Sequence, residues 1–117
     1  MKIEKFEDII AWQKAKILTI KIYSTFKDSR DFSFKDQIQR ASVSIMNNIA
    51  EGFERKGDKE LGKFLFIAKG SCGEVRSMLY LAFEFNYLTK EKTRELYDLS
   101  LEISRLLSGL IKTLNFN

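Results

Sequence analysis

The chain has 117 residues, of which 44% are hydrophobic, 13% aromatic and 31% charged. This length suits one domain with one core. Proline is absent and glycine occurs only six times, which favours long helices over a sandwich or barrel rich in turns. The 20 basic and 16 acidic residues give a net charge of +4, which is too small to identify a nucleic-acid-binding protein by itself.

Single residue types disfavour several kinds of site. Histidine is absent, which removes the commonest metal ligand and the usual general base, and we expect no cofactor. The one cysteine, Cys72, cannot form an internal disulfide. The N-terminal residues lack the apolar core of a signal peptide, and the longest apolar run, residues 78–83, is too short to span a bilayer. We therefore expect a cytoplasmic protein without membrane contact.

The first expected helix covers about residues 7–27, because apolar residues recur there every three or four positions. Glu7 and Asp8 fall in its first turn, where acidic groups are favourable. From residue 9 onward its charged residues are all basic, namely Lys14, Lys16, Lys21 and Lys27. This face is either an ordinary solvated surface or, repeated in an oligomer, a surface for a phosphate backbone.

The second expected helix covers about residues 34–54, with Ser33 as its N-cap, Asp36 three residues later, and Gly57 as a stop. Residues 41–50 carry no charge, and a helix uncharged around its circumference is usually covered on more than one side. One row of residues on this helix would find too few partners within a single bundle. We place a subunit interface at this row, which comprises Ser42, Met46, Ile49 and Phe53.

The third and fourth expected helices cover about residues 58–85, capped by Asp58 and ended by Asn86, and 89–114, capped by Thr89. Three glycines of the third helix share one side, and each costs up to ~1 kcal/mol in a helix interior. They suggest that another backbone approaches closely, which adds Gly62, Gly70 and Gly73 to the expected oligomer interface. Four amphipathic helices with short loops predict an all-α, antiparallel up-down-up-down four-helix bundle in one domain, residues 1–117.

Polar residues gather where the second and third helices would face each other. Arg40 and Glu74 are placed to form a partly buried ion pair, and hydrogen bonds would complete the set Arg40, Ser44, Asn48, Ser71 and Glu74. This set is either a ligand pocket or, as we favour, a structural network that fixes helix register.

No carrier of catalysis is visible, and we interpret the protein as a non-enzyme. Cys72 lies on an apolar row between Ala68 and Val75, which is typical of a small core residue. The run Gly70-Ser71-Cys72-Gly73 lies within a helix and lacks the signature of a phosphate-binding loop.

Three separated motifs resemble the four-helix-bundle family of 23S rRNA-intervening-sequence proteins, also called S23 ribosomal proteins. They are Trp12-Gln13-Lys14-Ala15, the segment 37–52 with Asn48-Ile49-Ala50-Glu51-Gly52 at its end, and Phe64-Leu65 through Ser71 followed by Glu74. The resemblance covers nearly the whole chain. It departs at Met46, where the family usually has proline, so the second helix is expected to be straighter there.

The resemblance implies a left-handed four-helix bundle that assembles into a ring-like homopentamer. Members are encoded within insertions in bacterial large-subunit rRNA genes, and many others stand alone. A related branch serves as the accessory protein of retroelements and binds RNA and reverse transcriptase.

Two hypotheses about function follow. The first is an oligomeric scaffold that binds RNA or DNA through the lysines of the first helix. The second is an adaptor for assembly or protein interaction, such as a partner of a reverse transcriptase. Binding that weakens steeply with salt distinguishes the first hypothesis, and self-association that survives high salt distinguishes the second.

Overall fold

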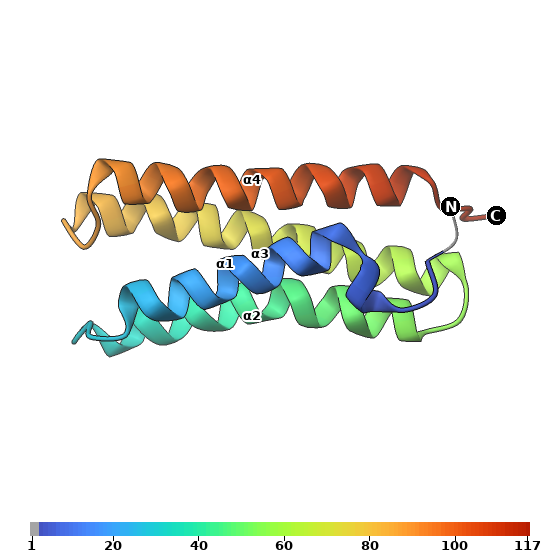
Figure 1. Cartoon of the computed structure of the whole chain (residues 1–117), viewed down its shortest axis with the longest axis horizontal. Coiled ribbons are helices and arrows are strands. Elements are labelled where there is room, and N and C mark those ends of the chain that lie inside the picture. Colours follow the sequence, from blue (N-terminus) through green and yellow to red (C-terminus); the bar gives the residue numbers. More distant parts are fainter. Residues whose placement is uncertain (1–2) are drawn as a thin grey trace.

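A computed structural model describes residues 3–117, which form four long helices (Figure 1). A short 3₁₀ turn, η1 (Phe6–Asp8), precedes the helices α1 (Ile10–Phe26), α2 (Phe32–Glu54), α3 (Asp58–Glu84) and α4 (Lys90–Lys112). The part of the chain that the structure describes contains no strand. All four expected helices are present, and α1 begins later than expected because Ile9 has an extended backbone between η1 and α1. Among the described helices, none combines the length and apolar character of a membrane span.

Neighbouring helices run in opposite directions. Lys14 of α1 pairs with Glu102 of α4, and Lys21 pairs with Glu95, so numbering rises along α1 while it falls along α4. The same inverse order holds for the other neighbouring helices. Contacts Thr19–Ser42 and Phe26–Phe34 join α1 to α2, and contacts Ser44–Ser71 and Gly52–Phe64 join α2 to α3. Contacts Cys72–Ser100 and Tyr80–Tyr97 join α3 to α4. Helices α1 and α3 each contact α2 and α4, so they occupy opposite corners of the bundle.

The core is a continuous apolar column along the bundle axis, filled by residues spaced three and four apart on each helix. Its largest fully buried side chains are Leu18, Ile22, Ile38, Ile45, Ile49, Leu65, Leu79, Leu96, Ile103 and Leu107. Buried hydroxyl groups link the helices within this column. The Thr19 hydroxyl donates to the Ser42 carbonyl at 3.1 Å, and the Ser100 hydroxyl donates to the Cys72 carbonyl at 3.0 Å. These small side chains let α1 approach α2, and α4 approach α3, without leaving a polar group unpaired.

Two of the expected helix caps are wrong. Helix α2 is capped by Asp31 instead of Ser33, since the Asp31 carboxylate accepts from the Phe34 N–H at 3.2 Å. Tyr87 donates to the same carboxylate at 2.6 Å, and these two bonds, the Tyr87 bond foremost, hold the Asp31 pKa below its usual value. Asp58 is the first residue of α3 and accepts from the Asn115 N–H instead of capping.

The remaining helix ends lie close to the expected positions. The Thr89 hydroxyl accepts from the Lys92 N–H, which confirms Thr89 as the cap of α4. Asn86 follows α3 with φ of 63°, a left-handed conformation that asparagine tolerates. Helix α2 ends at Glu54, and Gly57, with φ of 96°, makes the turn into α3 instead of stopping α2.

The expected subunit interface on α2 is wrong for two of its four residues. Ser42 and Ile49 are fully buried within the chain itself, because α1 and η1 cover this side of α2. Met46 and Phe53 are partly buried and pack against the same core. One bundle therefore supplies the cover that we assigned to a second copy.

The three glycines of α3 meet different surroundings. A Cβ on Gly62 would clash with the ring of Phe116, so the C-terminal tail makes the close approach there. Gly70 has open space around it, and Gly73 has only the end of the Arg76 side chain at 3.8 Å. Among residues 3–117, no backbone of another element comes within 4 Å of a Cβ placed on Gly70 or Gly73.

Gly52 allows α2 and α3 to approach each other, and replacing it is expected to destabilise the fold. A Cβ on Gly52 would lie 2.7 Å from the Phe64 Cβ and 3.2 Å from Leu61. Although alanine favours a helix by up to ~1 kcal/mol, such overpacking costs about 1–3 kcal/mol. We expect Gly52→Ala to lower the free energy of unfolding, measured by urea denaturation.

Gly109→Ala is the matched control, because Gly109 also lies near a helix end but has open space around it. This substitution should leave stability unchanged or raise it slightly. Equal effects of the two substitutions would contradict the close approach of α2 and α3.

Cys72 is part of the core, as expected. Its side chain is fully buried, and burial raises the pKa of the thiol to about 11, against smaller opposing effects of Arg76, Ser100 and Lys69.

The buried thiol is expected to be inert in the folded protein. With a pKa near 11, only about one thiol in a thousand is ionised at pH 8, and the thiolate is the nucleophile. Iodoacetamide should therefore modify Cys72 only after denaturation, as measured by mass spectrometry over time. Rapid modification of the native protein would show that Cys72 is accessible.

Candidate functional site

The lysines of α1 are divided between α4 and solvent. Lys14 lies 3.1 Å from Glu102 and Lys21 lies 2.8 Å from Glu95, so both point toward α4. The bonds that Lys21 and Lys92 donate to Glu95 lower the pKa of this carboxyl. Acidic residues of the neighbouring helix thus match the charges of Lys14 and Lys21, and a role of these two lysines in nucleic-acid binding stays a prediction.

The other two lysines of α1 lie on its outward side. The Lys16 ammonium lies 5.7 Å from the centre of the Trp12 ring, which stabilises its charge without neutralising it. Lys27 is exposed at the end of α1, and its carbonyl accepts from the Lys35 ammonium at 2.7 Å. Two charges remain there, too few for a basic surface along the helix.

Three of the five polar residues between α2 and α3 come together. The Ser44 and Ser71 hydroxyls lie 2.9 Å apart, and the Asn48 amide donates to the Ser44 carbonyl at 2.8 Å and to its hydroxyl at 2.9 Å. Among residues 3–117, no buried side-chain nitrogen or oxygen lacks a partner. This arrangement favours a structural network over a ligand pocket.

Arg40 and Glu74 do not form the expected ion pair. The Arg40 side chain is 78% exposed and reaches back one turn along α2 to Asp36, at 3.8 Å. Both Arg40 and Glu74 line a shallow cavity of about 380 Å³, and a second cavity of about 400 Å³ lies on the other side of Arg40. The expectation is wrong because Arg40 extends into solvent instead of across to α3.

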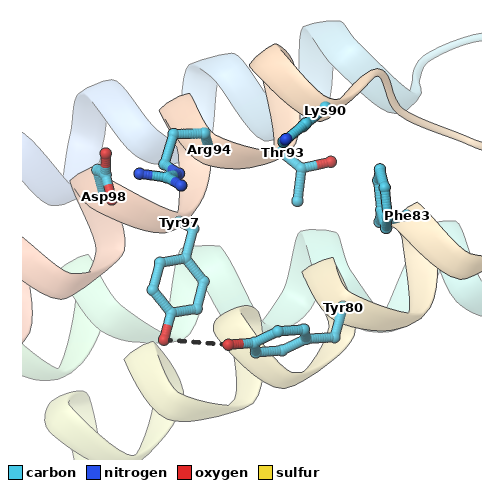
Figure 2. A pocket seen from close by; sticks show the side chains of 7 residues that line it. All are labelled: Tyr80, Phe83, Lys90, Thr93, Arg94, Tyr97 and Asp98. Atoms are coloured by element: carbon cyan, nitrogen blue, oxygen red, sulfur yellow. Dashed lines mark hydrogen bonds between the residues drawn. The ribbon is translucent and has the colours of Figure 1, made fainter.

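A different pocket lies between the end of α3 and the start of α4. It has a volume of about 350 Å³, and we call it the α3–α4 pocket; it is lined by Tyr80, Phe83, Lys90, Thr93, Arg94, Tyr97 and Asp98. Figure 2 shows the rings of Tyr80 and Phe83 coming from α3, and the other five side chains coming from α4. Aromatic and basic side chains thus share one surface near one end of the bundle.

The two tyrosines form the floor of the pocket. Their ring centroids are 5.5 Å apart at an interplanar angle of 77°, and the Tyr80 hydroxyl donates to the Tyr97 hydroxyl at 3.5 Å. This edge-to-face contact leaves ring surface of Tyr80 uncovered, since its side chain is 63% exposed. The hydrogen bond, and the nearby charge that an ionised Tyr97 would carry, raise the Tyr80 pKa above its usual value, so the Tyr80 hydroxyl stays neutral at physiological pH.

Basic groups surround the two rings. Within the described residues, neither Lys90 nor Arg94 has an acidic partner within 4.0 Å. Arg76 reaches across from α3 and donates to the Ser100 hydroxyl at 3.3 Å, one helical turn from Tyr80. Asp98 is the one acidic residue of the lining. The local charge is therefore positive.

The periodicity of the sequence does not predict this pocket. The sequence does contain the residues that form it: two aromatic residues three apart on α3, Tyr80 and Phe83, and two basic residues four apart on α4, Lys90 and Arg94. Only the register between the two helices brings these pairs together. No group of three or more acidic or cysteine side chains within residues 3–117 is arranged to hold a metal ion, and we assign no metal ligands.

The chain is similar to one group of bacterial proteins in both sequence and structure. A crystal structure of a protein of unknown function from the S23 ribosomal protein family of Bacteroides thetaiotaomicron superposes with a TM-score of 0.83 at 26% sequence identity. The match covers 88% of this chain and 99% of the other. No curated protein matches the chain at a significant level.

The family model for 23S rRNA-intervening sequence proteins matches residues 7–109. This range contains the three motifs that suggested the resemblance and reaches from η1 into the last turn of α4. The match spans well over half of the chain. The protein therefore belongs to the family of 23S rRNA-intervening sequence proteins.

Proposed function

We propose that this protein is a non-enzymatic scaffold that associates with copies of itself and binds nucleic acid, RNA foremost. The assembly is a homopentamer of left-handed antiparallel bundles, as the family resemblance implies. The observation that supports association is a pair of exposed apolar faces on opposite corners of the bundle.

The first apolar face lies on α1 and the second on α3. On α1, Ile10, Ile17 and Ile20 recur at helical spacing and are each about half exposed. On α3, Phe66 and Leu81 flank the open side of Gly70 and are similarly exposed. Isolated exposed apolar residues are ordinary, but rows of this kind on a small domain mark interaction surfaces.

The two faces suit a head-to-tail arrangement of copies. Because α1 and α3 occupy opposite corners of the bundle, their outward sides point away from each other. Contact between α1 of one copy and α3 of the next joins two different surfaces, and such contacts form a ring when the rotation closes. Gly70, which has open space around it, and Gly73, which meets only the end of the Arg76 side chain, would let a neighbouring helix approach α3 closely.

Nucleic-acid binding is supported by the separation of charges on α4. Two of its four acidic residues, Glu95 and Glu102, face the lysines of α1. Four of its five basic residues, Lys90, Arg94, Arg105 and Lys112, follow one another in steps of four, eleven and seven residues, which keeps them on one helical face. Repetition of this face in an assembly produces a positive surface for a phosphate backbone.

The second candidate function is an adaptor for another protein, such as a reverse transcriptase. The exposed apolar faces also favour this function, because they can bind a different chain. In that case self-association survives high salt, a protein partner is recovered, and no oligonucleotide binds.

Light scattering at physiological salt should give a mass about five times the 13.7 kDa of one chain. Ile20→Glu and Phe66→Glu should each lower this mass toward one chain, since a buried charge opposes an apolar contact by several kcal/mol. Ser33→Glu adds the same charge at an exposed position in the first turn of α2, where an acidic group is tolerated, and it should leave the mass unchanged.

A wild-type mass of one chain under all conditions would contradict the proposed assembly. An unchanged mass in both glutamate variants would contradict the assignment of the two faces.

Binding to a fluorescein-labelled oligouridylate should be measurable by anisotropy at about 50 mM salt and weaken steeply toward 200 mM, because bound cations are released from the phosphates. Absence of binding to RNA and DNA at the lower salt concentration would contradict the nucleic-acid function.

A further inference from the structure

The α3–α4 pocket brings exposed aromatic rings and basic side chains of two neighbouring helices together. Tyr80 is 63% and Phe83 41% exposed, although aromatic rings gain most from burial. Lys90 and Arg94 lie beside these rings on the neighbouring helix (Figure 2). The lining is therefore both flat and apolar on one side and positively charged on the other.

We propose that the α3–α4 pocket binds single-stranded nucleic acid. One base stacks on the ring of Tyr80 or Phe83, and the neighbouring phosphates contact Lys90 and Arg94. This proposal rests on the proposed nucleic-acid function and names the site that performs it. Aromatic platforms beside a basic groove are the general means by which proteins hold single strands.

The size and openness of the pocket suit one base with its flanking backbone. A volume of about 350 Å³ lies at the lower end of the range for small-molecule pockets, and the exposed Tyr80 and Phe83 leave the pocket open along the surface. A base in a duplex is stacked on both faces and cannot reach a side-chain ring without being unpaired. The site should therefore prefer single strands over duplexes.

The charges of the pocket attract a polyanion at its rim. Arg76 lies one turn from Tyr80, where its charge acts on the Tyr80 hydroxyl, and it adds a third positive group on the Ser100 side of the pocket. Asp98 opposes these charges, so it weakens binding of phosphate while its oxygens can accept from the N–H groups of a base. Removing the charge of Asp98 should strengthen binding, whereas reversing Lys90 and Arg94 should weaken it.

The basic face of α4 extends the site beyond one nucleotide. Arg105 and Lys112 continue the face that begins at Lys90, and at 1.5 Å per residue this face is about 33 Å long. Such a length accommodates several nucleotides, within the usual site size of about 4–16 nucleotides for a single-strand-binding domain.

A second copy of the chain is a poorer occupant of the pocket. In a self-complementary contact centred on the pocket, Lys90 and Arg94 would lie close to the same groups of the other copy, and like charges repel. The exposed apolar residues that we assign to contacts between copies, on α1 and on the outward side of α3, are not part of the pocket lining. The pocket is thus left for a partner of negative charge.

The test compares two substitutions that alter the pocket with matched controls. The probe is a fluorescein-labelled oligouridylate of about 20 nucleotides, longer than the expected site, with oligothymidylate and a duplex of the same length as further ligands. Lys90→Glu/Arg94→Glu should weaken binding at least tenfold and lower the slope of log affinity against log salt by about two. Lys56→Glu/Lys59→Glu changes the net charge equally at the far end of the bundle and should have a much smaller effect.

The stacking contact is tested at Tyr80. Tyr80→Ala should weaken binding roughly five- to a hundredfold, as expected for loss of one stacked base, whereas Tyr80→Phe keeps the ring and should bind like the wild type. Asp98→Asn should strengthen binding. Circular dichroism and light scattering should show that all variants keep the fold and mass of the wild type.

The outcomes separate this site from the function on which it rests. If the wild type binds none of the three ligands, the proposed nucleic-acid function fails. If the wild type binds but the Lys90/Arg94 and Tyr80→Ala variants bind equally well, the function stands and the site assignment is wrong. A preference for the duplex would also overturn the site assignment. So would a changed mass in the pocket variants, because the pocket would then lie between copies of the chain.

Discussion

The close approach of α2 and α3 at Gly52 is the constraint on which the arrangement of the bundle depends. At this contact the Phe64 Cβ fills the space that a side chain on Gly52 would need. Farther along the same pair of helices, the Ser44 and Ser71 hydroxyls meet at 2.9 Å. A shift of register by one residue would separate these hydroxyls and bring a larger side chain against Phe64, so the two contacts together select one alignment.

Charge pairing between α1 and α4 determines where positive charge remains on the surface. Glu95 and Glu102 bind Lys21 and Lys14, and this consumes acidic side chains on one side of α4. The other side retains Lys90 and Arg94 without acidic partners among the described residues. Lys14 and Lys21 therefore form ion pairs between α1 and α4. Because these pairs engage acidic residues of α4, the surface between α3 and α4 remains positively charged.

Much of the fold could be predicted from periodicity alone, because apolar spacing, Thr89 and Asn86 are local signals. The error at the start of α2 arose because Ser33 and Asp31 are both good caps, and the bond from Tyr87, 56 residues away, favours Asp31. Ser42 and Ile49 of α2 were wrongly assigned to a subunit interface. They are buried by α1 and η1, and the way these elements pack on α2 cannot be deduced from the spacing of apolar residues. The pocket was missed for the same reason: Tyr80 and Tyr97 meet only once α3 and α4 are in register.

The central claim is that single-stranded nucleic acid lies against the aromatic floor of the α3–α4 pocket. Photocrosslinking of a 4-thiouridine oligonucleotide, followed by mass spectrometric mapping, tests this claim directly because the base must touch the residue to which it attaches. The account predicts adducts on peptides containing Tyr80, Phe83 or Tyr97. Adducts confined to α1, at Lys16 or Lys27, would contradict it.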